Sequence, residues 1–339
     1  MSHVVTLTGA FKNAGDYLIG HRARALLRNH VTDEIINLNR KAITDDHYAL
    51  FNSARAVLLT GGPAYQEKIY PNVYDLDLNR IDVPVLAYGL GWKGKLNETP
   101  QSFKFTPEAF DFVQRIHADG SRFSSARCHL TSQMLNANDV HNVRMTGCPA
   151  WYDETKLAQD YAFPGKFDRV VFSMPAVPQK QVPALLLKLS RQFRGSQKYL
   201  SFQAGFDSGH WKNSAEYTRW NRRMANLGRV LGFTPISFES DYPKFESFME
   251  QIDFHVGYRV HSHIFSVSQR KTSLLIAEDS RGIGQVEAMG GSALLASTPT
   301  SEVAAGIDVL LDTNGAAIQT AVESMRATHG TMLEFLAQL

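Results

Sequence analysis

The chain has 339 residues, 44% of them hydrophobic and 20% charged, and this length exceeds what one hydrophobic core usually supports, so we expect two domains. Its 35 basic and 33 acidic residues are mixed along the sequence and leave a formal charge of +2, which argues against a nucleic-acid-binding arm. The two cysteines are too few for a disulfide framework, and no apolar run reaches the roughly 18 residues of a membrane span, so we expect a cytoplasmic protein.

In the first half of the chain, short β-branched or aliphatic segments alternate with polar turns and longer amphipathic segments. This alternation is typical of βαβ units with a parallel sheet. The pattern predicts strands at residues 4–8, 34–38, 56–60, 83–88, 122–126 and 142–145, and helices at 16–28, 106–118 and 130–136.

The same alternation continues in the second half. Strands are predicted at residues 169–173, 198–202, 234–238, 254–257, 273–277 and 293–295, and helices at 181–193, 215–231, 244–251, 261–268 and 285–289. A polar segment at 151–166 separates the two series. We therefore predict an α/β fold of two Rossmann-like domains with parallel sheets that face a central cleft, residues 1–155 and 156–315, and a closing helix at 316–339 that packs back on the first domain.

The first candidate ligand-binding segment is the turn Asn13-Ala14-Gly15-Asp16, between the first strand and the first helix. Asp16 could cap this helix, and its backbone N–H groups and positive dipole end suit an anion or a polar sugar. The alternative is a plain capped turn without a ligand. The segment is neither a dinucleotide GxGxxG fingerprint nor a Walker P-loop.

Glycine-containing turns follow the third and fourth predicted strands, at Gly61-Gly62-Pro63 and Gly89-Leu90-Gly91-Trp92. At the carboxyl ends of parallel strands, such glycines let a ligand approach the backbone closely. Trp92 could stack on a sugar ring, although burial in a core is the more common fate of a tryptophan.

Basic residues follow two strands of the second half. Gly257-Tyr258-Arg259-Val260-His261 runs from a strand into a helix, and Asp279-Ser280-Arg281 follows the next strand. Because the carboxyl ends of parallel strands meet at one edge of a sheet, Arg259, His261 and Arg281 are expected at one rim.

His255, His261 and His263 lie close in sequence and invite a metal-binding interpretation. No carboxylate or cysteine completes a convincing ligand set around them. We therefore predict no metal site.

With these segments, the chain resembles the polysaccharide pyruvyl transferase family, over roughly residues 5–290. Cys128 and Cys148 stand where that family has aspartates, Thr131 where it has serine, and Arg281 where it has lysine. The matching segments, in the family's order, are Asn13-Ala14-Gly15-Asp16, Gly61-Gly62, Arg127-Cys128-His129-Leu130-Thr131, Cys148-Pro149-Ala150, Gly257-Tyr258-Arg259-Val260-His261 and Asp279-Ser280-Arg281.

The resemblance implies a GT-B-like pair of Rossmann-type domains and a transferase that uses phosphoenolpyruvate as donor. It implies a sugar or lipid-linked glycan precursor of the cell envelope as acceptor, and no cofactor besides the co-substrate. Peripheral association with a membrane and the oligomeric state are left open.

Phosphoenolpyruvate carries about three negative charges, which guanidinium groups hold well through charge-assisted hydrogen bonds. We predict that Arg127 and Arg281, one from each domain, hold the donor. Arg259 is a further candidate, which could instead pair with an acid such as Asp253. His261 is the expected general acid toward the methylene carbon, because imidazole titrates near neutral pH.

Loops of the first domain are expected to face the acceptor. The residues assigned to this side are Asn13, Asp16, Gly61, Gly62 and Trp92.

Two other functions fit the same sequence. A nucleotide-sugar-dependent glycosyltransferase would have a similar two-domain shape, since fold alone does not fix the donor. A non-catalytic glycan-binding relative is the other alternative, because cysteines replace two carboxylates of the family, at Cys128 and Cys148.

Overall fold

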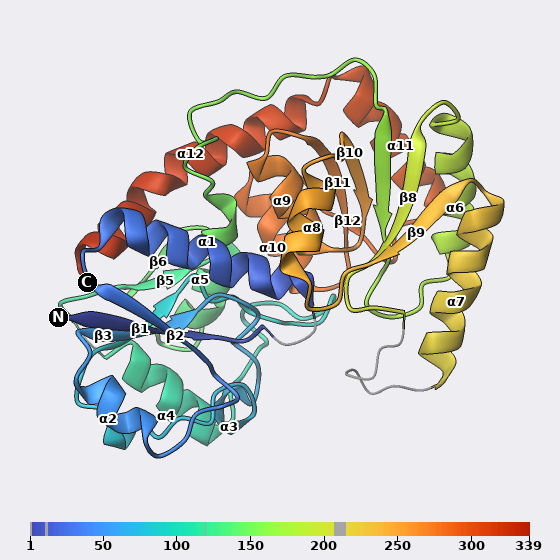
Figure 1. The fold of residues 1–339 in the computed structure, drawn as a ribbon. Helices are drawn as coiled ribbons and strands as arrows, with labels where there is room; N and C mark the ends of the chain where they lie inside the picture. The colour runs from blue at the N-terminus through green and yellow to red at the C-terminus, as the bar shows by residue number, and fades with distance from the viewer. Residues whose placement is uncertain (1, 11–12, 119, 207–214) are drawn as a thin grey trace.

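Two separate parallel sheets divide the chain into a first half, with strands β1 to β6, and a second half, with strands β7 to β12 (Figure 1). The computed structural model describes residues 2–10, 13–118, 120–206 and 215–339. Within these residues, no helix combines the length and the hydropathy needed to cross a membrane.

In the first half, four strands pair in the order β2-β1-β3-β4, and the β5-β6 pair continues the sheet through a bridge between Leu90 and Ala126. This order is the common doubly wound arrangement 2-1-3-4-5 extended by β6, with its switch point between β1 and β3. The strands are β1 (His3–Thr8), β2 (Glu34–Asn39), β3 (Ala56–Thr60), β4 (Val85–Tyr88), β5 (Ser124–Ala126) and β6 (Val143–Met145).

Helices cover both faces of the first sheet, because successive side chains of a strand point to opposite faces. Val4 of β1 belongs to the core that also contains α1 and α12, whereas Val5 belongs to a second core with α4. The helical elements are α1 (Ala14–His30), α2 (His47–Asn52), α3 (Ile69–Asn72), η1 (Leu78–Arg80), α4 (Pro107–Ile116), α5 (His129–Asn136) and η2 (Pro149–Trp151).

The second half contains one six-stranded sheet in the order β12-β11-β10-β7-β8-β9. This is the 3-2-1-4-5-6 order of dinucleotide-binding folds, with its switch point between β7 and β10. Its strands are β7 (Arg169–Ser173), β8 (Gln197–Phe202), β9 (Phe233–Ser237), β10 (Phe254–Gly257), β11 (Thr272–Ala277) and β12 (Leu294–Leu295). Its helices are α6 (Val182–Gln192), α7 (Ala215–Val230), α8 (Tyr242–Met249), α9 (Val260–Ser268), α10 (Ser280–Ala288) and α11 (Thr300–Asp312).

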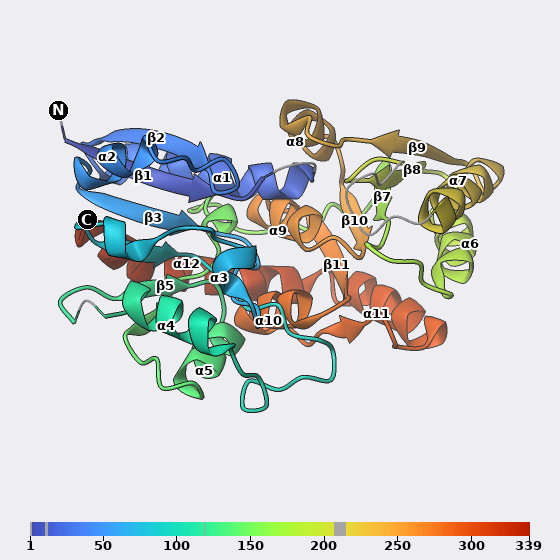
Figure 2. The same cartoon turned by 90° about the horizontal axis from the view of Figure 1, so that it is seen from below.

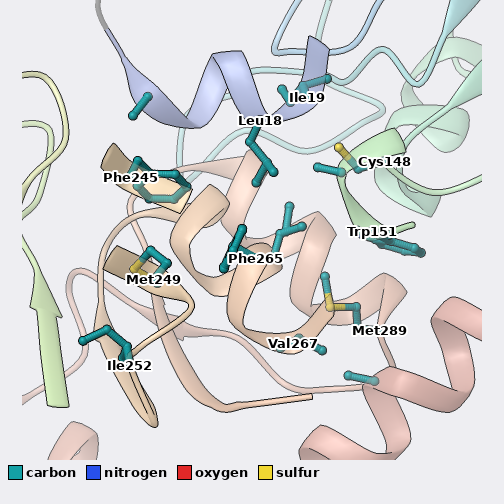
Figure 3. Packing of buried hydrophobic residues seen from close by; sticks show 14 of the residues in the cluster. Leu18, Ile19, Cys148, Trp151, Phe245, Met249, Ile252, Phe265, Val267 and Met289 are labelled. Atoms are coloured by element: carbon teal, nitrogen blue, oxygen red, sulfur yellow. The ribbon is translucent and has the colours of Figure 1, made fainter. Parts of the chain in front are cut away.

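One hydrophobic core spans the two halves. Leu18 of α1 points toward Phe265 of α9, with Phe245 of α8 on one side of them and Trp151 of η2 on the other (Figure 3). Every residue of α9 from His261 onward is buried, as expected for a helix enclosed between two layers. The halves are therefore joined by packed side chains and not only by the connecting chain.

The last helix, α12 (Ala316–Ala337), returns from the second half to the first (Figures 1 and 2). It packs against α9 and then against α1, β5 and β6. The predicted return of the C-terminal helix to the first half is thus confirmed.

All twelve predicted strands are present, with ends displaced by at most two residues. Three helices were not predicted, namely α2, α3 and α11. The helix predicted at 285–289 begins earlier, at Ser280, because the Asp279 side chain accepts a hydrogen bond from the Arg281 N–H and caps it. The predicted limits of the domains stay predictions.

Candidate functional site

Loops from both halves meet in a cleft formed by two adjoining cavities. The smaller cavity, about 40 Å³, is lined by Asn13, Pro63 and Arg127 of the first half and by Arg259, His261 and Arg281 of the second. The larger cavity, about 450 Å³, shares Asn13, Pro63 and Arg281 with the smaller one. We call the two together the interhalf cleft. It lies where the carboxyl ends of β1 and β3 face those of β10 and β11, next to the switch points of both sheets.

Arg127 lies directly after β5 and is only 2% exposed. Its Nη2 reaches the Trp92 carbonyl at a long 3.4 Å, and its buried Nε has no hydrogen-bond partner. Among the described residues, no carboxylate lies within ion-pairing distance of this guanidinium. A buried cation without a counter-charge is costly, so the position favours an anionic ligand.

Two neighbours hold Arg127 in this position. A Cβ atom on Gly91 would lie 1.8 Å from the Arg127 Nε, so the space beside the guanidinium exists because residue 91 is glycine. Gln285 of α10 donates from Nε2 to the Arg127 carbonyl at 3.1 Å and accepts from the Trp151 indole at 2.7 Å. A buried bridge between the two halves thus fixes the backbone at Arg127.

His261 is the second residue of α9, and it faces α1 of the first half. Its Nδ1 lies 3.9 Å from Asp16 Oδ1, and its buried Nε2 has no hydrogen-bond partner. Burial and the charges of Arg127, Arg281 and Arg259 lower the pKa of His261 to about 3. The imidazole is therefore neutral at pH 7, and a negative ligand among these arginines would oppose their contribution and raise its pKa.

Arg259 is the N-cap residue of α9, but its side chain does not cap that helix. Its Nε donates to the Met174 carbonyl at 2.7 Å and its Nη2 to the Pro175 carbonyl at 3.3 Å. The suggested pairing with Asp253 is wrong, because that carboxylate accepts the N–H of Arg169 at 2.8 Å. These carbonyls leave the charge of Arg259 uncompensated, and the acidic group that senses it in the smaller cavity is Glu278.

Arg281 lies in the first turn of α10, with its side chain 27% exposed. Its Nε donates to Oδ1 and Oδ2 of Asp279 at 2.9 and 2.8 Å, and its Nη2 donates to Oδ2 at 2.6 Å. This pair orients the guanidinium and offsets part of its charge, so Arg281 is a weaker anion site than Arg127.

On the first-half side, Asn13, Asp16, Gly61 and Gly62 all line the larger cavity. Asn13, and not Asp16, caps α1, since its Oδ1 accepts the Gly15 N–H at 3.1 Å. Gly62 has a φ of +79° and open space where a Cβ atom would lie, so its backbone is accessible from the cavity.

Asp16 projects toward the arginines of the cleft. Burial raises the pKa of this carboxyl, while the charges of Arg281, Arg40, Arg259 and Arg127 oppose the rise. Its side chain keeps 30% exposure, so water moderates both effects. Among the described residues that line the larger cavity, it is the one acidic group.

The structure does not bring Trp92 to the cleft. Trp92 is 2% exposed and packs edge-on against Phe103 at 5.6 Å in the core of the first half. Its ring is enclosed by apolar neighbours, so the proposed stacking on a sugar is corrected to a core role.

The three clustered histidines do not converge. His255 Nδ1 and His263 Nδ1 each lie 2.8 Å from the hydroxyl of Ser273, inside the second sheet, whereas His261 faces the cleft. Burial keeps the pKa of His255 well below its usual value and lowers that of His263 to about 4. Both are neutral hydrogen-bonding residues of the core.

Sequence reasoning missed four charged residues that line the cleft. Lys41 and Lys93 line the larger cavity. Arg40 follows β2 and also lines the larger cavity, with buried Nε and Nη1 atoms that lack hydrogen-bond partners and its guanidinium 5.1 Å from the Tyr74 ring centre. Glu278 lines the smaller cavity and accepts the Ala176 N–H at 2.9 Å, and burial raises its pKa. Glu278 directly follows the strand predicted at 273–277, and that position is the signal that could have identified it.

Comparison with known proteins agrees with this architecture. The family model described as polysaccharide pyruvyl transferase matches residues 13–280. A co-structure of S. aureus MnaA with UDP has 13% identity and a TM-score of 0.58, over 98% of this chain and 94% of that chain. A UDP-GlcNAc 2-epimerase from Neisseria meningitidis bound to UDP-GlcNAc has 13% identity and a TM-score of 0.55, over 99% of this chain and 100% of that chain.

A putative UDP-N-acetylglucosamine 2-epimerase from Listeria monocytogenes has 14% identity and a TM-score of 0.57, over 98% of this chain and 94% of that chain. At such identities the likeness shows the fold alone, and this fold is GT-B-like, with two Rossmann-like domains. The comparison with curated proteins gave no significant match.

Proposed function

Because the chain belongs to the polysaccharide pyruvyl transferase family, and is therefore a transferase, we propose that it moves the pyruvyl group of phosphoenolpyruvate onto two hydroxyls of a sugar. The observation that carries the proposal is the convergence of Arg127, Arg259, Arg281 and His261, from both halves, on one cavity.

The charges of the interhalf cleft suit the donor, which would extend from the smaller cavity into the adjoining part of the larger one at Arg281. Phosphoenolpyruvate brings about three negative charges, and three guanidinium groups beside a helix N-terminus are the groups that bind carboxylate and phosphate best. Arg127 is the strongest of these sites because no carboxylate in the described parts of the chain forms an ion pair with it. Burial and then the arginine charges lower the pKa of His261, and the negative charge of the donor would raise this pKa toward the protonated form that proton transfer requires.

The reaction then proceeds by addition and displacement at one carbon. His261 gives a proton to the methylene carbon, which becomes a methyl group, and the first sugar hydroxyl attacks the neighbouring carbon. Phosphate leaves, and the second hydroxyl closes the cyclic ketal. One of the two hydroxyl protons returns to His261 and replaces the proton that formed the new C–H bond. The other hydroxyl proton leaves with phosphate. Positioned proton transfer of this kind is worth roughly 10²–10⁴ in rate.

The acceptor would occupy the larger cavity. Asn13, Asp16 and the bare turn at Gly61 and Gly62 offer polar contacts to a sugar, and Arg40 adds a cation that suits a phosphorylated or lipid-linked glycan precursor. Such an acceptor would bring the protein to the cytoplasmic membrane surface as a peripheral protein. No cofactor beyond the donor is needed in this scheme.

A nucleotide-sugar-dependent glycosyltransferase is the competing function, since two of the structural neighbours named above are complexes with UDP or UDP-GlcNAc. Thermal shift distinguishes the two donors, because a ligand that binds the native state raises the melting temperature. Stabilisation by phosphoenolpyruvate supports pyruvyl transfer, and stabilisation by UDP-sugars alone contradicts it.

His261→Gln tests the catalytic step and separates an enzyme from a non-catalytic glycan-binding relative. We expect phosphate release from phosphoenolpyruvate, measured with a panel of glycan acceptors, to fall by about 10²–10⁴-fold, because glutamine cannot supply the proton. His141→Ala, at an exposed position, is the control and should keep full activity. Equal phosphate release by wild type and His261→Gln would exclude His261 as the acid.

A further inference from the structure

Two histidines and a glutamate meet at the surface of the molecule, on elements that are distant in the sequence. His30 is the last residue of α1, Glu154 follows η2, and His329 belongs to α12. We infer that these three residues form a binding site for one divalent transition-metal ion, with zinc as the best fit, that joins α12 to the first half.

The three side chains converge on one point. His30 Nε2 lies 2.6 Å and His329 Nε2 lies 3.0 Å from the same Glu154 oxygen, Oε1. All three candidate ligand atoms lie within 4.8 Å of one another. Zinc bound at about 2.0–2.2 Å to nitrogen and oxygen in a tetrahedron separates its ligand atoms by roughly 3.4 Å, so small side-chain shifts suffice.

The donor types of the cluster suit a metal. Two imidazoles and one carboxylate suit zinc and its neighbours in the first transition row.

Surrounding contacts orient the ligands. Asn29 Nδ2 donates to the other carboxylate oxygen, Glu154 Oε2, at 2.7 Å, and the Tyr152 ring lies 5.1 Å from the His329 ring. Such outer contacts commonly fix ligand geometry in metal sites. The side chains of His30, Glu154 and His329 are 32%, 22% and 14% exposed, so an ion and a completing water have access.

The site is independent of the interhalf cleft, since none of its three ligands lines either cavity. An ion there would connect α1, the segment after η2 and α12. Its effect is therefore expected on stability, and binding can be measured without any substrate.

The test uses the full chain, stripped of metal with a chelator and then titrated with Zn²⁺ or Co²⁺. We expect one high-affinity equivalent by calorimetry, an increase in melting temperature with Zn²⁺, and the visible absorption of four-coordinate Co²⁺. His30→Ala and Glu154→Gln should weaken binding at least tenfold and abolish the thermal shift. His141→Ala, an exposed histidine outside the cluster, should bind as wild type does.

Glu154→Gln keeps the size of the side chain and His30 is exposed, so these variants should fold even if His329→Ala does not. Absence of one-to-one binding in the wild type would overturn the proposal. So would unchanged Zn²⁺ affinity in both variants, or a loss of stability in them with no response to Zn²⁺ in any protein, which would identify the cluster as a hydrogen-bonded network only.

Discussion

At the scale of single residues, the geometry of the cleft depends on Gly91, which itself lines neither cavity. A Cβ atom at position 91 would overlap the Arg127 side chain, so Gly91→Ala should displace that guanidinium. Losing a charge-assisted hydrogen bond of about 1.5–3 kcal/mol would weaken phosphoenolpyruvate binding roughly 10- to 150-fold. Calorimetric titration with the donor measures this change.

Gly195→Ala is the matched control, because a Cβ atom there would have no neighbour within 4 Å. Its affinity for the donor should equal that of wild type. A Gly91→Ala protein with native circular dichroism and unchanged donor affinity would show that Arg127 does not bind the donor.

Residues of the cleft could be predicted from the sequence where they belong to a recognisable motif. Arg127, Arg259, His261 and Arg281 belong to recognisable segments, and the structure places all four around one cavity. Their assigned roles stay predictions. Trp92 could not be placed in advance, because whether a tryptophan after a strand faces a ligand or a core depends on which helix covers that strand end.

At the scale of elements, α10 connects the two halves through Gln285. Replacing this fully buried residue, as in Gln285→Leu, leaves the Trp151 N–H and the Arg127 carbonyl unpaired. Each unsatisfied group costs about 1–3 kcal/mol, so the free energy of unfolding in urea should fall by several kcal/mol. The KM for phosphoenolpyruvate should also rise, because the backbone at Arg127 loses its support.

Gln251→Leu provides the comparison, since Gln251 is exposed and water can replace its hydrogen bonds. Its unfolding free energy should change by less than about 1 kcal/mol. If both variants lost equal stability, the buried bridge would have no special importance.

Strands were easier to predict than helices in this chain. Parallel strands buried on both faces have continuous apolar runs, as in Ala56–Thr60, and these runs identify them directly. The missed α11 has apolar residues at Val303, Ile307 and Leu310, which is helical spacing, so its signal was present in the sequence. The importance of Arg40 was not predictable, because it depends on β2 pairing with β1, and strand order is not encoded locally.

At the scale of the whole molecule, buried neutral histidines make stability depend on pH. Burial lowers the pKa of each, to about 3 for His117 and His261, to about 4 for His263, and well below the usual value for His255. Below about pH 6.5 the unfolded chain therefore binds protons that the folded chain does not.

Stability should consequently decline as pH falls from about 6.5 toward 4, with each histidine contributing up to about 1.4 kcal/mol per pH unit. Urea unfolding at pH 7.5, 6.0 and 5.0 measures the slope. His117→Gln should reduce this slope by up to about 1.4 kcal/mol per pH unit, which is the contribution of one proton. A free energy of unfolding that stays constant between pH 7.5 and 5.0 would contradict the expectation.

The apolar layer between the halves also limits how the enzyme can work. Many two-domain proteins close on their substrates by a hinge motion. In this protein, moving the two halves apart would expose Leu18, Phe245 and Phe265 to water. At about 25 cal/mol for each Å² uncovered, wide opening is strongly opposed. The lining of the interhalf cleft is thus held in place by the shared core, and we expect substrates to enter and leave by movement of loops and side chains rather than of a hinge.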